Sequence, residues 1–249
     1  MASFNDFINH NNKVSHRDCV EYVITQPIGH FAREVRCPLI IGKDIFVGDF
    51  SKKTNRGIPA TFRFKATEEP SESNKSPMNA VYAIRKKELN EGVLITVGRT
   101  SESDIPLNDY AISKQHAAFV KKANRYFITD LGSTNGVMVN DKKVSPKEFA
   151  PLQTRSNVVI GRFSFLFAHP IYFYCMVYAK HLSMFPAKED LMQIAERVDI
   201  KDLMRIAKQN RYDYGENPAN YRQQIINHMD TKLSRVDVLH WLSGLPCGL

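Results

Sequence analysis

Three short motifs in the middle of this 249-residue chain contain side chains that could bind an anion. Gly98-Arg99 offers a guanidinium group, Ser113-Lys114-Gln115-His116 a hydroxyl and an amine, and Ser133-Thr134-Asn135-Gly136 two hydroxyls and an amide. A phosphate ester needs such donors, because it carries close to two negative charges and three acceptor oxygens. The three motifs together are therefore suited to an anionic ligand such as a phosphate ester, provided that the fold brings them together.

Each motif also has a simpler structural explanation. Asn135-Gly136 is the strongest short signal for a β-hairpin turn, because both residues tolerate a positive φ. Gly98-Arg99 alone equally suits a turn glycine beside a surface arginine, and Ser113 to His116 suits a loop that enters a strand. The predicted secondary structure around the motifs is needed to distinguish between these interpretations.

Residues 80–169 have the pattern of a β-structure. Short apolar runs recur there with turn residues between them, in the order AVYAI, VLITVG, DIPL, HAAFVKK, RYFITDL, VMVN, NVVIG and FSFLFA. Runs of this length and spacing are typical of an antiparallel β-sandwich or barrel. All three motifs would then lie where strands run into loops, which is where a sandwich presents ligand-binding residues.

The pattern changes to a helical period from about residue 171. Apolar residues stand three and four apart in EDLMQIAERV, IKDLMRIAKQ, NYRQQIINHM and RVDVLHWLSGL. Such stripes form the core of a bundle far more often than a ligand site. The sequence therefore predicts a multidomain α+β protein, with a β-sandwich over residues 80–170 and a small all-α helical bundle over residues 171–249.

The first 79 residues are less regular. Residues 1–58 are expected to form an N-terminal extension of mixed structure, with extended chain in CPLIIGKDIFVGDF. Residues 59–79 should contain a short strand, ATFRFKA (60–66), and a flexible linker rich in Ser, Glu, Pro and Asn.

Charge and composition exclude few partners. The net charge is +8, and residues 80–170 carry most of the excess, with 13 basic and 8 acidic side chains. That balance favours an anionic partner without specifying it. The nearly neutral residues 171–249, with 10 basic and 9 acidic side chains, argue against a DNA-binding helix. The apolar run 163–178 is too short for a membrane span and is expected to be strand Phe163–Ala168 followed by a helix start.

In their order and spacing the three motifs resemble the forkhead-associated (FHA) domain, a β-sandwich that binds phosphothreonine. The family pattern is a Gly-Arg ending one strand, a Ser-x-x-His entering another and a Ser/Thr-Asn-Gly turn, and the resemblance covers about residues 80–169. Two positions depart from the pattern. Arg155-Ser156-Asn157 stands where the family usually has Gly-Asp, and Lys114 stands where many members have Arg, which removes a bidentate fork.

The resemblance implies a role for each matched residue. Phosphate contacts would come from Arg99, Ser113, Lys114 and Thr134, and Asn135 would hold the main chain of the peptide. The shape of the site would depend on Gly98, His116, Gly132, Ser133 and Gly136. The implied partner is a threonine-phosphorylated protein made by an upstream Ser/Thr kinase. In a variant of this scheme the chain associates with itself through a phosphorylated threonine such as Thr54 or Thr67.

Other function classes are less well supported by the residues. No Walker loop, GxSxG or HExxH motif is present, and Ser113 and His116 have poor spacing for a catalytic pair, so we expect no enzyme and no cofactor. The widely separated Cys19, Cys37, Cys175 and Cys247 do not indicate a metal site. An FHA fold that serves only as a phosphate-independent scaffold, with the helices as the interacting part, is the alternative. The N-terminus has no signal-peptide pattern, and we expect a cytoplasmic, bacterial protein.

Overall fold

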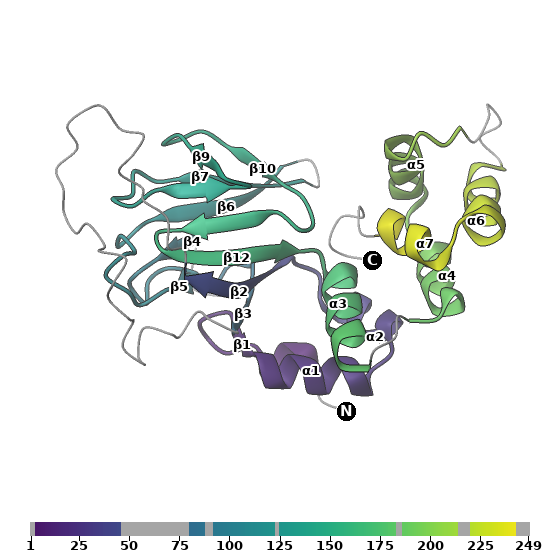
Figure 1. Cartoon of the computed structure of the whole chain (residues 1–249), viewed down its shortest axis with the longest axis horizontal. Coiled ribbons are helices and arrows are strands. Elements are labelled where there is room, and N and C mark those ends of the chain that lie inside the picture. The colour runs from purple at the N-terminus through teal and green to yellow at the C-terminus, as the bar shows by residue number, and fades with distance from the viewer. Residues whose placement is uncertain are drawn as a thin grey trace. The chain divides into compact units, whose positions relative to one another are not determined.

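The computed structural model describes residues 3–45, 80–87, 92–122, 125–182, 186–213 and 220–242 (Figure 1). The chain divides into two compact units. The β unit comprises Ile8–His16 and Ile40–Phe167, and the helical unit comprises Met1–Phe7, Arg17–Leu39 and Ala168–Leu249. The predicted strand at residues 60–66 and the predicted linker at 67–79 lie outside the described residues.

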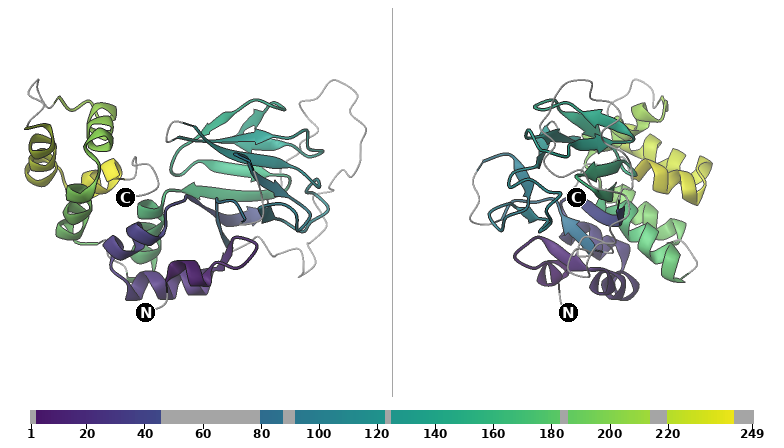
Figure 2. Two further views of the ribbon diagram at one scale, coloured as in Figure 1. Left: turned by 180° about the vertical axis from the view of Figure 1, so that it is seen from behind. Right: turned by 60° about the vertical axis from the view of Figure 1, so that its left-hand side comes forward.

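The described strands of the β unit form a sandwich of two sheets, which Figures 1 and 2 show as facing layers. The first sheet has the order β1-β3-β2-β12-β11-β8-β9, and the second has the order β10-β7-β6-β4-β5. The strands are β1 (Lys13–Ser15), β2 (Leu39–Ile45), β3 (Ala80–Ala83), β4 (Ile95–Gly98), β5 (Ile105–Pro106), β6 (Ala117–Lys122), β7 (Arg125–Asp130), β8 (Val137–Val139), β9 (Lys142–Val144), β10 (Ala150–Leu152), β11 (Asn157–Ile160) and β12 (Phe163–Ala168).

Alternating apolar side chains account for the core of the sandwich. In β12 the rings of Phe163, Phe165 and Phe167 are almost fully buried, whereas the residues between them are partly exposed. Phe119 of β6 is fully buried in the other sheet. Each such ring removes a large apolar area from water, about 2–3 kcal/mol of stabilisation per side chain. This burial makes the sandwich a rigid support for its loops.

The β-sandwich expected from the sequence is confirmed, with two differences. Strands β1 and β2, from the region expected to be a separate extension (1–58), pair within the first sheet, so the β unit is larger than residues 80–170. Strand β5 runs parallel to β4, with Val97 opposite Ile105, whereas the other strand pairs described by register are antiparallel. Strands β1 and β5 have only three and two residues, and the partners of β2 in the sheet, β3 and β12, lie far along the chain. Local periodicity specifies neither such short strands nor such distant pairings.

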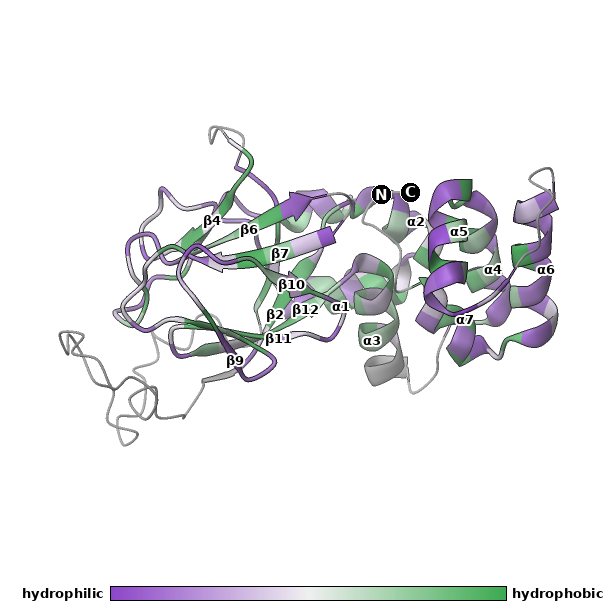
Figure 3. Cartoon of the chain, turned by 90° about the horizontal axis from the view of Figure 1, so that it is seen from above, coloured by the Kyte–Doolittle hydropathy of each residue, from purple (hydrophilic) through white to green (hydrophobic). Residues whose placement is uncertain are grey.

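The helical unit contains the predicted C-terminal helices and also the N-terminal ones. Its described elements are η1 (Phe4–Phe7), α1 (His16–Thr25), α2 (Ile28–Glu34), α3 (Pro170–Leu182), α4 (Lys188–Arg197), α5 (Ile200–Gln209), α6 (Tyr221–Lys232) and α7 (Arg235–Leu242). Each of α4–α7 carries both hydrophilic and hydrophobic residues (Figure 3). Their buried side chains include Leu191, Leu203, Ile225 and Trp241, so the predicted helical stripes do form a core.

Local interactions define the ends and contacts of these helices. The Asp199 carboxylate accepts a hydrogen bond from Lys201 N at 2.8 Å and caps α5. Near the N-terminus, Phe31 of α2 stacks on Phe173 of α3, with ring centres 6.0 Å apart. Strand Phe163–Ala168 and the helix that begins at Pro170 confirm the interpretation of the apolar run 163–178. Among the described residues no helix has both the length and the hydropathy that a membrane span requires.

Candidate functional site

The three motifs lie at one edge of the second sheet. Gly98 ends β4, Ser113 to Gln115 precede β6, and the turn after Asp130 follows β7. These strands are neighbours, and their register pairs Val97 with Ala117 and Ala117 with Asp130. The end of β4, the start of β6 and the end of β7 therefore coincide, and the sheet brings together the three loops that the sequence singled out.

Gly98 allows the first two loops to approach closely. A Cβ atom on Gly98 would lie 2.0 Å from the carbonyl oxygen of Lys114 and 2.5 Å from Ser103 Oγ, so no other residue fits without a shift of the backbone. Next to it, Arg99 N donates a hydrogen bond to Ser113 O at 3.0 Å. The glycine thus places the backbone of Arg99 directly against the backbone of Ser113.

The hydroxyls of Ser113 and Thr134 lie side by side at the surface. Thr134 N donates to Ser113 Oγ at 3.1 Å, and Ser113 Oγ lies 3.4 Å from Thr134 Oγ1. Ser113 and Arg99 are half-buried, whereas Thr134 and Lys114 are exposed. The two hydroxyls thus adjoin each other, and the backbones of Arg99 and Lys114 belong to the same pair of neighbouring loops.

His116 connects the second and third loops from the interior. The imidazole is fully buried; its Nδ1 accepts a hydrogen bond from Ser113 N at 3.0 Å, and its Nε2 donates to Gly136 O at 3.0 Å. Burial lowers the pKa of His116, against smaller raising effects of the bond to Gly136 and the charge of Asp130. A neutral ring with hydrogen on Nε2 satisfies both bonds. The two bonds of His116 thus connect Ser113 in the second loop with Gly136 in the third.

The carboxylate of Asp130 shapes the turn, a role that the sequence analysis missed. Asp130 Oδ1 accepts hydrogen bonds from Gly132 N at 2.9 Å and Ser133 N at 2.7 Å, and Oδ2 accepts one from Ser133 Oγ at 3.1 Å. Ser133 Oγ in turn accepts from Gly136 N at 2.9 Å. Gly132 and Gly136 have φ of +85° and +80°, which only glycine adopts without strain. An Asp two residues before Gly-Ser is a known turn signal and could have revealed this role.

Asn135 is held against the loop that precedes Ser113. Its Nδ2 donates to Ala111 O at 2.8 Å. A Cβ atom on Gly161 would lie 2.7 Å from the same oxygen, so the glycine permits the close approach of its own backbone to this loop. Arg162 forms an ion pair with the buried Asp109 of the same loop. Gly161 and Arg162, which form a second Gly-Arg dipeptide, therefore have structural contacts with this loop. Asp109 was missed by the sequence analysis because its partner lies 53 residues away.

Further side chains lie at the rim of the site. Tyr110 is 78% exposed, and the guanidinium carbon of Arg99 lies 6.0 Å from the centre of its ring. Lys143 of β9 lies beside the turn, since its Cε would be 3.5 Å from a Cβ atom on Gly136. Neither residue was singled out by the sequence analysis, because neither belongs to a recognisable motif. Among the described residues no group of three or more His, Cys, Asp or Glu side chains is placed to hold a metal ion.

The family model of the FHA domain matches residues 95–161, which span β4 to the turn after β11 and contain every residue of the three motifs. Residues 95–161 form an FHA domain. The resemblance stated on the motifs is confirmed by this match.

Relatives of the FHA domain include named bacterial regulators. The oxoglutarate dehydrogenase inhibitor of Corynebacterium efficiens is 39% identical over 72 residues, which cover 29% of this chain and 49% of that protein. The glycogen accumulation regulator GarA of Mycobacterium tuberculosis is 35% identical over 79 residues, 32% of this chain and 47% of that protein. The chain thus spans about half the length of the curated relatives it matches. Among solved structures, the FHA domain of a Chlamydia trachomatis protein is 33% identical, with a TM-score of 0.30, over 36% of this chain and 85% of its own.

Proposed function

We propose that the chain is a regulatory adaptor whose FHA domain docks a partner protein through a phosphorylated threonine. The observation that carries this proposal is the convergence of Arg99, Ser113 and Thr134 at one sheet edge, where Arg99 N donates to Ser113 O and Thr134 N donates to Ser113 Oγ. In the proposal the guanidinium and the two hydroxyls bind the phosphate ester together, because charge-assisted hydrogen bonds are strong and the backbone that carries these side chains is already fixed.

Each residue has a role in this proposal. The Arg99 guanidinium, the Ser113 and Thr134 hydroxyls and the Lys114 amine contact phosphate oxygens. The side chain of Asn135 uses one N–H on Ala111 O, and its carbonyl oxygen accepts a hydrogen bond from the main chain of the peptide. The aromatic face of Tyr110 contacts the peptide next to the phosphothreonine.

The role is one of binding rather than catalysis. The curated relatives are named as an inhibitor and a regulator, which supports a regulatory function without a reaction of its own. A Ser/Thr kinase acts upstream and creates the ligand, and the helical unit transmits the docking event. In the alternative, the FHA fold is a phosphate-independent scaffold, and peptide binding distinguishes the two.

A peptide titration tests the proposal. A fluorescent degenerate phosphothreonine peptide library is titrated against the full-length wild type, Arg99→Ala and Arg125→Ala. Arg125 is a matched control, because it is an exposed arginine at the opposite end of β7 from the turn. Loss of one charge-assisted anchor should weaken binding about thirtyfold for Arg99→Ala, and Arg125→Ala should bind like the wild type.

The controls separate the alternatives. Phosphoserine and unphosphorylated libraries should bind much more weakly than the phosphothreonine library. If the wild type binds no library, the titration is repeated after phosphatase treatment, which would free a site occupied by a phosphothreonine of the chain itself. Absence of binding in both states, or equal binding of phosphorylated and unphosphorylated peptides, would refute phosphothreonine recognition and favour the scaffold.

A further inference from the structure

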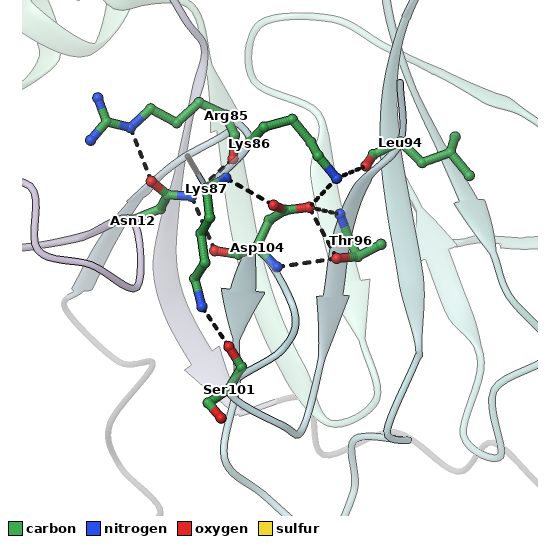
Figure 4. A network of polar contacts seen from close by, with 8 residues as sticks. All are labelled: Asn12, Arg85, Lys86, Lys87, Leu94, Thr96, Ser101 and Asp104. Carbon is green, nitrogen blue, oxygen red and sulfur yellow. Dashed lines mark hydrogen bonds and ion pairs between the residues drawn. The ribbon is translucent and has the colours of Figure 1, made fainter. Parts of the chain in front are cut away.

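A buried carboxylate fixes the far end of the loop that begins at Arg99. Asp104 is fully buried, and its Oδ2 accepts hydrogen bonds from Thr96 N at 2.7 Å and from Lys86 Nζ at 3.1 Å (Figure 4). Its Oδ1 accepts from Lys87 N at 2.9 Å. Burying this charge is tolerated because every one of these donors compensates for lost water. The loop from Arg99 to Asp104 thus has a fixed end point.

The side chain of Asn12, from the N-terminal part of the β unit, forms a hydrogen bond with the end of this loop. Its Nδ2 donates to Asp104 O at 3.0 Å and to Arg85 O at 2.9 Å, and its Oδ1 accepts from Arg85 Nε at 2.9 Å (Figure 4). Asn12 is only 3% exposed, and its φ of +58° is a conformation that asparagine adopts more readily than most residues. A side chain 92 residues away in the sequence thus holds the backbone of Asp104.

The contacts continue from Asp104 to Arg99. Lys87 Nζ donates to Ser101 O at 2.7 Å, and Ser103 N donates to Thr100 O at 3.1 Å. Ser103 Oγ would lie only 2.5 Å from a Cβ atom on Gly98, so the loop packs directly on the residue before Arg99. Six residues connect the parallel strands β4 and β5 here, and both ends of this short loop are fixed by hydrogen bonds.

We propose that Asn12 is a positioning residue for the phosphopeptide site: by holding Asp104, it fixes the loop that carries Arg99. This inference rests on the proposed phosphothreonine binding. It gives the N-terminal residues 8–16 a part in ligand recognition, although none of them belongs to the FHA motifs. Residues 8–15 connect η1 with α1 of the helical unit, so the segment that supports the ligand loop is continuous with those helices.

Two substitutions at Asn12 test the role in the full chain. Asn12→Gly accepts the positive φ and removes all three side-chain hydrogen bonds. Asn12→Asp keeps the size of the side chain and its tolerance of a positive φ, but a carboxylate cannot donate to the two carbonyl oxygens of Asp104 and Arg85. This variant replaces Asn12→Gly in the test if the glycine variant fails to fold. Asn140→Gly is the matched control, because Asn140 also has a positive φ (+48°) and a side-chain bond, to Asn157 N at 2.8 Å, at the end of β8 distant from Gly136.

Phosphothreonine-peptide affinity is the first readout. Asn12→Gly should weaken binding about tenfold, and Asn140→Gly should leave it unchanged. If Asn12 acts through Arg99, the loss of affinity caused by Asn12→Gly should be smaller in a protein that already carries Arg99→Lys. In a protein that carries Thr134→Ala, the two losses of affinity should multiply. The positioning role would be overturned if Asn12→Gly lowered the melting temperature but bound the peptide like the wild type. It would also be overturned if the loss of affinity in Asn12→Gly multiplied fully with that of Arg99→Lys as well as that of Thr134→Ala.

Hydrogen exchange gives a readout that does not need the ligand. Asn12→Gly should speed amide exchange in residues 99–103 and leave that of β6 unchanged. If the wild type binds no phosphopeptide before or after phosphatase treatment, the proposed function fails, yet this exchange result still decides whether Asn12 orders the loop. Unchanged exchange in residues 99–103 would overturn the inference, whatever the outcome of the titration.

Discussion

Substitution of Gly98 by alanine should damage both stability and binding. The added Cβ would lie 2.0 Å from Lys114 O, 2.5 Å from Ser103 Oγ and 2.9 Å from the carbonyl carbon of Lys114. Cβ atoms are rarely closer than about 3 Å to an oxygen, so the two backbones must separate by about 1 Å. That movement stretches the 3.0 Å bond from Arg99 N to Ser113 O beyond hydrogen-bonding range.

The magnitude follows from these contacts. Overpacking costs about 1–3 kcal/mol and the lost hydrogen bond about 1 kcal/mol, so Gly98→Ala should destabilise the β unit by about 2–4 kcal/mol. Gly132→Ala is the comparison, because Gly132 has a φ of +85° but no atom within 4 Å of its added Cβ. Its cost should be only the strain of the left-handed conformation, about 1–2 kcal/mol.

Urea unfolding followed by far-UV circular dichroism gives the free-energy changes, and hydrogen exchange at β6 locates the loss in the β unit. We therefore predict a larger loss of stability for Gly98→Ala than for Gly132→Ala, although a positive φ, the usual reason why a glycine cannot be replaced, is present only at Gly132 of the two. Equal stability of Gly98→Ala and the wild type, or a larger loss in Gly132→Ala, would refute the steric argument. Phosphopeptide binding should also fall in Gly98→Ala, because Arg99 moves with the backbone.

Two further predictions concern the turn and its buried histidine. Asp130→Ala removes the acceptor of three hydrogen bonds from Gly132 and Ser133, which should lower the free energy of unfolding by about 3 kcal/mol and weaken phosphopeptide binding. Urea unfolding measures the first effect and peptide titration the second. Unchanged stability and affinity would contradict the role of the carboxylate. Because burial lowers the pKa of His116 in the folded state, the unfolded chain binds more protons below about pH 6.5, and stability should fall as the pH decreases from there towards the folded-state pKa. His116→Gln should remove this part of the pH dependence, which urea unfolding at a series of pH values measures. If the free energy of unfolding of His116→Gln changed with pH as steeply as that of the wild type, His116 would not titrate differently in the folded and unfolded states.

Local patterns predicted much of the fold and of the site. The alternation in FSFLFA and the three- and four-residue spacing in EDLMQIAERV specify strand β12 and helix α4, because one buried face requires that spacing. Gly98, Arg99 and Asn135 could be singled out because their conformational and chemical properties are visible in single residues and dipeptides.

Other features depend on contacts between distant residues and have no local signature. Strand β1 has three residues, and only its pairing with β3 makes it a strand. Asn12 and Asp109 are ordinary polar residues in the sequence, and their importance comes from Asp104 and Arg162, which lie far along the chain. Such roles follow from the register of the strands, and a sequence pattern cannot supply that register when the strands are short.

Phosphothreonine binding at this site can be tested by an NMR titration of the isotopically labelled full-length protein with a phosphothreonine peptide selected from the degenerate library. We expect large chemical-shift changes for the amides of Arg99, Lys114, Thr134 and Asn135, and none with the unphosphorylated peptide. Shifts confined to other surfaces, such as the β6–β7 hairpin at Lys122 and Arg125, or equal shifts with both peptides, would contradict a phosphothreonine site at this edge of the sheet.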